Sequence, residues 1–270
     1  MRLGGDRVTK IFLDSRYALA DGSIEIPGGV LLEPTNRVWL GEFSCVSSWD
    51  TIDSTNNRLY VEEKLPPLFA IYKRIVLIPS GVYDDDSLAT AIATALNGPS
   101  KTPGIGNYVV ARTSGSSGTI SRTYTIECGG SFFKIPDEWY VRYFYFDNKA
   151  SAVTNSTNRL FSFRAGSDWA TTLTSTFVDL RRVHSIFLHS PGIGNHNTIG
   201  PTGARDIFEK VPCDVGYGGA IHWYMSGSEH DSVECGVNSI TLIKIELRDV
   251  AGNLIDLNGT HWSATLLFGR

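Results

Sequence analysis

The residues best suited to chemistry lie close together in the last quarter of the chain: His222, Glu229, His230 and Asp231. Imidazoles and carboxylates are common general acids, general bases and metal ligands. In an α/β-hydrolase, such residues are accompanied by a nucleophile elbow, and in a zinc protease they lie in an H-E-x-x-H helix. Other acid–base enzymes have a pair of carboxylates that a rigid motif holds in place. The sequence around these residues carries none of these patterns. We therefore interpret them as polar turn residues and predict no catalytic residue.

Two other groups of residues are of types that bind metal ions, but their spacing in the sequence does not fit a metal site. His184 and His189 are five residues apart in an expected strand, so their side chains point to opposite faces and cannot share a metal ion. The run Asp84 to Asp86 lacks the alternating ligands and the final glutamate of a calcium loop. Acidic residues directly before an apolar helix are typical of a helix N-terminus, so we predict a cap there.

The four cysteines, Cys45, Cys128, Cys213 and Cys235, are widely separated in sequence. They form no C-x-x-C pair and have no neighbouring histidine pair, which are the patterns of zinc sites and redox motifs. We expect buried, reduced thiols without metal and predict no cofactor.

The glycine-rich stretch SPGIGNHNTIGPTGARD has the composition of a phosphate-binding loop. A phosphate-binding P-loop requires Lys-Ser/Thr after its last glycine and lies between a strand and a helix. GPTGARD has neither feature, so the sequence predicts no nucleotide or other small-molecule substrate.

Composition limits the class of protein. The chain has 270 residues, 42% of them hydrophobic, and a formal net charge of −4. This is enough apolar material for a packed core, and the charge does not favour sequence-specific nucleic-acid binding. No apolar run reaches 18 residues, and the opening MRLGGDRVTK is too polar for a signal peptide. We expect no membrane span and no secretion signal.

The stretch from Ile240 to Phe268 carries the clearest strand pattern. Apolar residues alternate from Ile240 to Leu247, a turn follows at RDVAGN, and alternation resumes at His261, which predicts two strands of a buried sheet. In the second strand, period-2 geometry places Trp262, Ala264, Leu266 and Phe268 on the core face, and Ser263, Thr265 and Leu267 on the other.

The rest of the chain has a similar strand-and-turn rhythm. Strands are expected at IFLDSR, SIEIP, 37–46, 57–63, 69–78, 108–112, 122–128, 177–190 and AIHWYMS, with a bulge near Gly41. One helix is predicted from Ser87 to Leu96, and a single helical turn from Ala204 to Lys210. About ten short strands, with no alternation of strands and helices, predict an all-β fold: an antiparallel single jelly-roll β-sandwich with one short helix.

The expected domain organisation has two parts. Residues 1–10 form a polar N-terminal arm that docks outside its own domain, and residues 11–270 form the jelly-roll domain. An aromatic-rich stretch at about 131–176 is predicted to be a decorated insertion into that domain.

The order of several motifs resembles the penton (minor capsid) proteins of polinton-like viruses, virophages and related icosahedral viruses. The segments NRVWLGEFSCVSSWDTIDSTNNRLYVEE and KRIVLIPSGVYDDDSLATAIATALNG are similar to the first half of that family. Its turn, strand, G-x-Y and helix motifs correspond to Trp49, Asn56–Glu63, Gly81–Tyr83 and Leu88–Asn97. VDLRRVHSIFLHSPGIG, GARDIFEKVP and LRDVAGNLIDLNGTHWSATLLF resemble the second half.

This resemblance implies a viral structural protein in the virion, without enzymatic activity, made in the host cell without a signal peptide. It implies a homopentamer at the capsid vertex, in contact with the major capsid protein of the same shell. Two alternatives stay open: a carbohydrate- or receptor-binding β-sandwich such as an attachment head, and an enzyme on a cupin-like jelly roll. Solution mass with and without sugars separates the vertex pentamer from the carbohydrate-binding alternative.

Overall fold

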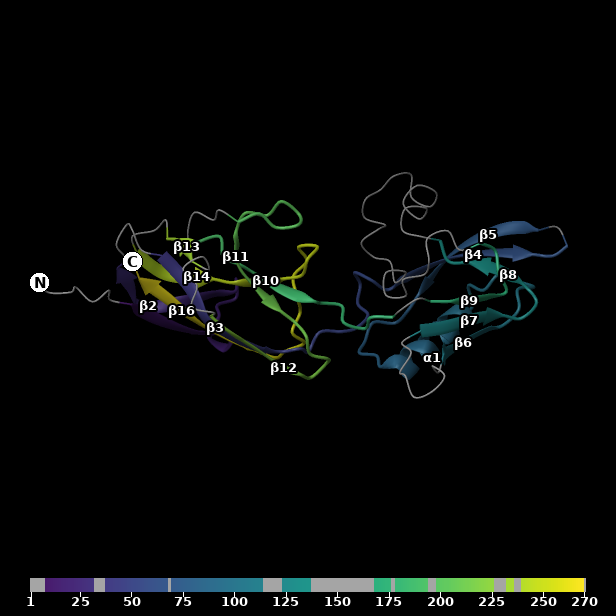
Figure 1. Cartoon of the computed structure of the whole chain (residues 1–270), viewed down its shortest axis with the longest axis horizontal. Coiled ribbons are helices and arrows are strands. Elements are labelled where there is room, and N and C mark those ends of the chain that lie inside the picture. Colours follow the sequence, from purple (N-terminus) through teal and green to yellow (C-terminus); the bar gives the residue numbers. More distant parts are fainter. Residues whose placement is uncertain are drawn as a thin grey trace, which may run out of the picture. The chain divides into compact units, whose positions relative to one another are not determined.

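The computed structural model describes residues 8–31, 37–67, 69–113, 123–136, 168–175, 178–193, 198–225, 232–235 and 239–269. The chain divides into two compact units, Met1–Trp49 with Val183–Arg270, and Asp50–Arg182. Each unit has its own sheets and its own core (Figure 1). We call them unit 1 and unit 2.

Unit 1 is a sandwich of antiparallel sheets. Its strands are β1 (Thr9–Asp14), β2 (Ser23–Leu31), β3 (Arg37–Val46), β10 (Ser185–His189), β11 (Ile207–Pro212), β12 (Ala220–Tyr224), β13 (Val233–Glu234), β14 (Ser239–Lys244), β15 (Glu246–Arg248) and β16 (Trp262–Gly269). One sheet has the order β1-β16-β3-β12, and β13 also pairs with β3. The others are β14-β2 and β11-β10-β15. A short 3-10 helix, η1 (Ser15–Tyr17), follows β1.

The core of unit 1 forms where alternate residues of these sheets meet. Phe43 and Leu266 from the first sheet belong to the same buried cluster as Ile243 and Leu188 from the other two. Full burial of one such side chain stabilises the fold by about 1.5–3 kcal/mol. Strand β3 pairs with β16, more than 200 residues later in the sequence, and this pairing joins the N-terminal and C-terminal parts of unit 1.

The expected bulge at Gly41 is confirmed. The register between β3 and β16 shifts at Thr265/Leu266, and Gly41 has no partner there. A Cβ atom at this position would lie 3.1 Å from Leu267 Cγ and 3.2 Å from the Thr265 carbonyl oxygen. Glycine thus allows the two strands to stay close while the bulge restores the inward direction of the following residues.

Within its described residues, unit 2 contains two three-stranded antiparallel sheets and a helix. Its elements are β4 (Arg58–Leu65), β5 (Ala70–Leu77), α1 (Asp85–Leu96), β6 (Tyr108–Thr113), β7 (Thr123–Cys128), β8 (Phe132–Lys134) and β9 (Thr172–Thr174). The sheet orders are β5-β4-β8 and β6-β7-β9. Val61, Ile126 and Ile92, one from each sheet and one from α1, belong to a single buried cluster.

The predicted cap at the acidic run is confirmed. The Ser87 backbone N–H donates to the Asp84 carboxylate at 2.8 Å, and the Asp84 N–H donates to Ser87 Oγ at 3.0 Å, which is a capping box. A hydrogen bond from the Ser87 hydroxyl, and next the one from the Ser87 backbone N–H, lower the pKa of Asp84. The stripe Leu88, Ala89, Ile92 and Leu96 is buried as the periodicity predicts.

Three sequence predictions are wrong in detail. The segment from Ala204 to Lys210 contributes to strand β11, because pairing with β10 overrides its local helical tendency. The long strand or broken strand pair expected from residue 177 to Ser190 is a single short strand, Ser185–His189, within the described residues. The two C-terminal strands do not share a sheet: β14 pairs with β2, β15 with β10, and β16 with β1 and β3.

The domain boundaries also differ from the predicted ones. The chain contacts place the breaks at Trp49/Asp50 and Arg182/Val183, so unit 2 enters the sequence of unit 1 between β3 and β10. The expected insertion at about 131–176 falls inside unit 2, and residues 137–167 of it lie outside the described residues. The N-terminal arm at 1–10 stays a prediction, because only its last three residues are described, two of them in β1.

Candidate assembly surfaces

Of the four residues that the sequence analysis singled out for chemistry, the structure describes only His222, and it lies in no catalytic arrangement of described residues. His222 is exposed on β12, and its Nδ1 lies 3.2 Å from Ser44 Oγ. The acid in the same cross-strand row is Asp14, which is two strands from Ser44, about 10 Å away. Asp14 is bound by Arg16 instead. Glu229, His230 and Asp231 lie outside the described residues.

His184 is exposed and lies directly before β10, whereas His189 is buried within that strand. His189 Nδ1 lies 2.8 Å from Asp206 Oδ1, an arrangement that fastens β10 to the residue before β11. Among the described residues, no three histidine, cysteine or acidic side chains are grouped closely enough to hold a metal ion.

The glycine-rich loop after β10 uses its backbone donors internally. The Gly200 N–H donates to the Ala204 carbonyl at 2.8 Å, and the Gly203 N–H donates to the Gly200 carbonyl at 2.9 Å. A phosphate-binding loop points such N–H groups at its ligand. The described ends of this loop therefore form a closed turn rather than an anion cradle.

All four cysteines are buried and unbridged. Burial raises the pKa of Cys45 to about 12 and also raises that of Cys128. Because the thiolate is the reactive species, buried neutral thiols react slowly with disulfide reagents.

We expect the folded protein to react with a thiol reagent such as DTNB far more slowly than the denatured protein, which should release four equivalents. Purified protein should contain no stoichiometric zinc. Metal analysis and the time course of DTNB release check both statements. Rapid release from the folded chain, or one zinc per chain, would contradict the assignment.

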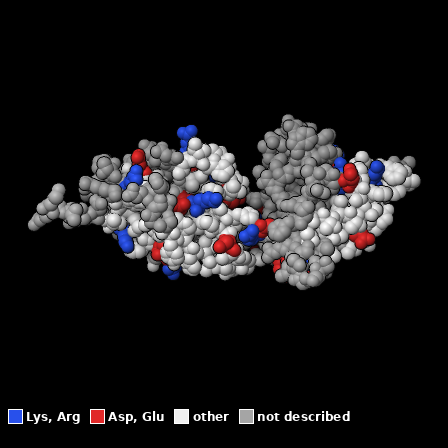
Figure 2. All heavy atoms as spheres, viewed as in Figure 1, with Lys and Arg blue, Asp and Glu red and all other residues white. Residues whose placement is uncertain are grey.

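Charged residues are interspersed on the surface. On the face that Figure 2 shows, lysine and arginine lie beside aspartate and glutamate across the described residues. Mixed charge of this kind gives no broad field of one sign for a nucleic-acid backbone. In the part of the chain that the structure describes, no helix is long and apolar enough to cross a membrane.

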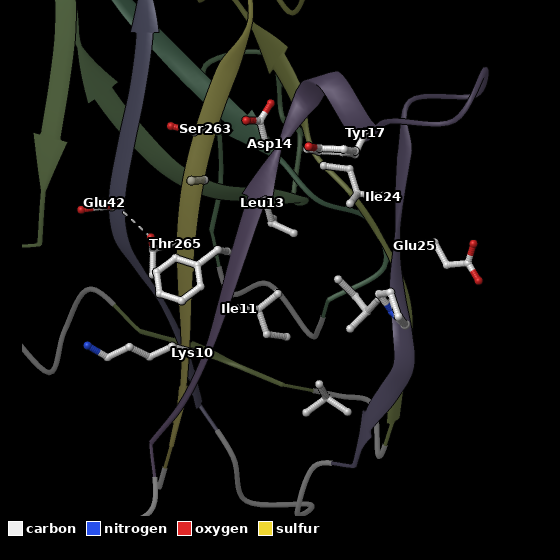
Figure 3. Close-up of a pocket in the computed structure, with 15 residues that line it drawn as sticks. Lys10, Ile11, Leu13, Asp14, Tyr17, Ile24, Glu25, Glu42, Ser263 and Thr265 are labelled. Carbon is white, nitrogen blue, oxygen red and sulfur yellow. Dashed lines mark hydrogen bonds between the residues drawn. The ribbon is translucent and has the colours of Figure 1, made fainter.

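A hollow of about 700 Å³ lies along the edge of unit 1, between β1 and β2. Both are edge strands of their sheets, so each has one edge with which no described strand pairs. Figure 3 shows Ile11, Leu13 and Ile24 in the space between the two ribbons. These three side chains are buried, whereas Phe12 and Tyr17 beside the hollow are each 75% exposed. We call this feature the β1–β2 groove.

Acidic groups outnumber basic ones along the β1–β2 groove. Lys10, Asp14, Glu25 and Glu42 are the charged residues that line it, one cation against three anions, a net charge of −2. Arg16 holds Asp14 in a side-chain hydrogen bond, which lowers the pKa of this carboxyl to about 2. Thr265 donates to Glu42 at 3.1 Å, a bond drawn in Figure 3.

Unit 2 also has an exposed apolar surface. Ile71, Ile75 and Leu77 alternate along β5, the edge strand of its sheet, and are 55%, 39% and 61% exposed. Lysine at position 73 is the one charged residue among them on this face. Long apolar edge strands favour pairing with another chain, so this strand is a second candidate contact surface.

A buried ion pair lies on the opposite face of the same hairpin. Arg74 Nη2 is 3.3 Å from Glu63 Oε1, with the two side chains 6% and 0% exposed. Tyr108 donates to the same carboxylate oxygen at 2.9 Å, and Arg74 donates to the Leu96 carbonyl at 2.7 Å. Burial, and next the charge of Glu63, raise the pKa of Tyr108. The group connects β4, β5, β6 and α1, and the side chains of Glu63, Arg74 and Tyr108 are all buried.

No protein-family model and no curated protein matches the sequence. Among solved structures, the crystal structure of the mavirus penton protein is similar to this chain over 97% of its length and 99% of that protein's length. The TM-score is 0.55 and the sequence identity is 12%. The chain has the fold of a penton protein. The predicted antiparallel jelly roll with one helix is thus confirmed, and the penton resemblance inferred from motif order holds for the fold of the whole chain.

Proposed function

We propose that this chain is a viral structural protein that forms the vertex of an icosahedral capsid as a homopentamer. The observation that carries the proposal is the extent of the fold similarity to the mavirus penton protein, which covers both units of this chain and nearly all of that one. A shared jelly roll alone would support many functions. Similarity over 97% of this chain and 99% of that one supports a much narrower set.

The surfaces of the chain suit a ring. A closed ring uses heterologous contacts, in which two different patches of one subunit meet the complementary patches of its neighbours. The β1–β2 groove and the outer face of β5 are two such apolar patches, one in each unit. The proposal includes contact with the major capsid protein of the same shell, location in the virion and no enzymatic role.

A second candidate function is binding of a carbohydrate receptor. Lys64 Nζ and Lys134 Nζ each lie 5.3 Å from the centre of the Trp169 ring, and Lys64 Nζ lies 5.2 Å from the Phe69 ring. Aromatic rings and cations together recognise anionic sugars through stacking and charge. Glu62 accepts a 2.8 Å contact from Lys134 and offsets part of this charge, so the pentamer is the better supported function.

Sedimentation of the purified chain with and without a sialylated or sulfated oligosaccharide separates the two functions. A vertex protein is expected to form a species of five chains, about 148 kDa from 5 × 29.6 kDa, at high concentration, and the sugar should not change it. A monomer or trimer that binds the sugar, with binding lost in Lys64→Gln, would favour the receptor-binding function and contradict the pentamer.

A further inference from the structure

We propose that Asn258 is a site of spontaneous deamidation, in which the backbone nitrogen of Gly259 displaces the side-chain amide and weakens its attachment to Ser48. The chain contains the pair Asn-Gly twice, at Asn97-Gly98 and at Asn258-Gly259. The surroundings of the two pairs differ in ways that direct the reaction to the second. Because the reaction takes place within one chain, it does not depend on the proposed function.

Deamidation is a hydrolysis that asparagine undergoes without an enzyme, and a following glycine favours it because no Cβ shields the attacking nitrogen. The glycine nitrogen loses its proton to water or hydroxide and forms a bond to the asparagine Cγ. The Cγ–Nδ2 bond breaks, and the amide takes up a proton and leaves as ammonia. Water then opens the cyclic imide at either carbonyl, which gives aspartate or isoaspartate. The net change replaces NH2 by OH.

A tight turn before β16 explains why asparagine and glycine are adjacent here. The backbone angle φ is 48° at Asn258 and 79° at Gly259, in the left-handed region that these two residue types adopt most easily. Both residues are exposed, and apart from the chain neighbours no heavy atom lies within 4 Å of the position that a Cβ would take at Gly259. Water and hydroxide therefore have access to the reacting atoms.

The attacking nitrogen is available at one pair and engaged at the other. No group in the described part of the chain accepts a hydrogen bond from the Gly259 N–H. The Gly98 N–H instead donates to the Ala95 carbonyl at 3.2 Å, directly after α1, and this oxygen would lie 3.1 Å from a Cβ at Gly98. The Gly98 nitrogen must break this bond and turn before it can attack.

The side chain of Asn97 is fixed between α1 and β6. Asn97 is the C-cap residue of α1, and its Nδ2 donates to the Ala93 carbonyl at 2.9 Å and to the Tyr108 carbonyl at 2.7 Å. Its Oδ1 accepts from the Tyr108 N–H at 2.9 Å. Attack at the Asn97 Cγ therefore requires the end of the helix to separate from β6. The turn at Asn258 belongs to no helix or strand, so no such separation is needed there.

Deamidation would act on a group of hydrogen bonds around Ser48. Asn258 Nδ2 donates to the Ser48 carbonyl at 2.8 Å. Ser48 is buried, and its Oγ donates to the Leu257 carbonyl at 2.6 Å and lies 2.7 Å from Thr260 Oγ1. Aspartate has no side-chain N–H, so its carboxylate would face the Ser48 carbonyl as one acceptor against another. We expect the turn before β16 to loosen its attachment to the residues after β3.

Peptide mapping by mass spectrometry, on full-length protein aged in mildly alkaline buffer, tests the site. In the folded protein we expect a gain of one dalton at Asn258, with isoaspartate in the product. Asn97 should react about tenfold more slowly, because its bonds to Tyr108 must open first. In denatured protein the two sites should react at similar rates. Asn258→Gln is the control, which should remove the gain at this site and leave the rate at Asn97 unchanged.

Hydrogen exchange in the variant Asn258→Asp tests the structural consequence. The amides of Thr260 and Trp262 donate to the Leu257 carbonyl and to Ser15 Oγ. We expect both to exchange about fivefold faster than in the unchanged protein, the factor for the loss of one hydrogen bond. Asn253→Asp is the matched control, because it adds the same charge in the preceding turn, where Asn253 is bonded to Asp249. It should leave these two amides unchanged.

Equal rates at Asn97 and Asn258 in the folded protein, or no mass gain at Asn258, would overturn the assignment of the site. Unchanged exchange at Thr260 and Trp262 in Asn258→Asp, or an equal increase in Asn253→Asp, would overturn the effect on the turn.

Discussion

Replacing Trp262 with alanine is expected to lower the free energy of unfolding by about 3–5 kcal/mol, the usual loss for a large aromatic side chain in a core. Trp262 begins β16, is 8% exposed, and stacks on Phe43 with ring centres 6.3 Å apart. Its backbone N–H also donates to Ser15 Oγ at 2.9 Å. Since domains of this kind are stable by only about 5–15 kcal/mol, unit 1 would be close to unfolding.

Ser263→Ala is the matched control, because Ser263 is exposed next to Trp262 in the same strand. It should cost about 0.5 kcal/mol. Denaturant unfolding followed by circular dichroism compares the two variants. Equal small effects would show that Trp262 contributes no core packing and that the assignment of its face is wrong.

Thr265 departs from the sequence prediction, which placed it with Ser263 on the solvent face. It is buried, at 7% exposure, and its hydroxyl donates to Glu42 on the neighbouring strand. We therefore expect Thr265→Ala to cost about 1 kcal/mol, the net value of one hydrogen bond, rather than the small loss of an exposed site. The same unfolding experiment measures it.

The second large effect is expected in unit 2. Glu63→Gln removes the negative charge from the buried pair and leaves the Arg74 guanidinium without a counter-ion, at an expected cost of about 3–5 kcal/mol. Arg74→Met should lower the free energy of unfolding by a similar amount, because it leaves the buried Glu63 carboxylate beside Tyr108 without a counter-ion.

The double variant Glu63→Leu with Arg74→Met is the informative control. Removing both charges replaces a buried ion pair by apolar groups, which is often neutral or stabilising. The double variant should therefore be more stable than either single variant in denaturant unfolding. Additive losses would show that the ion pair is not the source of the single-variant effects.

The sequence predicts best the features that depend on local order. Alternation in residues 262–268 identifies four of the six buried residues of β16, and the acidic run before Leu88 identifies the cap of α1. Both follow from backbone periodicity and from unsatisfied N–H groups at a helix start. The strand expected at residues 37–46 coincides with β3, including the bulge at Gly41.

Features that depend on distant pairing are not predicted. GARDIFEK has no strong strand alternation, and only β10 makes part of it a strand. The burial of Thr265 requires knowing that Glu42 lies opposite it, 223 residues away. The β1–β2 groove requires the order of strands in two sheets, which hydrophobic periodicity does not specify.

The buried pair in unit 2 did leave a signal in the sequence. The β4–β5 hairpin turns at Pro66 and Pro67, and residues of the two strands pair in order from this turn. This pairing places Glu63 and Arg74 on the same face of the hairpin. The other residues of that face are apolar: Leu59, Val61 and Val76. Charges of opposite sign at core positions of one hairpin indicate a buried ion pair. Single-strand patterns do not reveal it, because each strand taken alone shows only one misplaced charge.

Electron cryo-microscopy of shells assembled from this chain and a candidate major capsid protein would show whether the chain forms capsid vertices. We expect five copies of this chain around each fivefold axis, and shells that lack density there when the chain is omitted. Density for this chain away from the fivefold axes, or intact vertices without it, would refute the proposed vertex function.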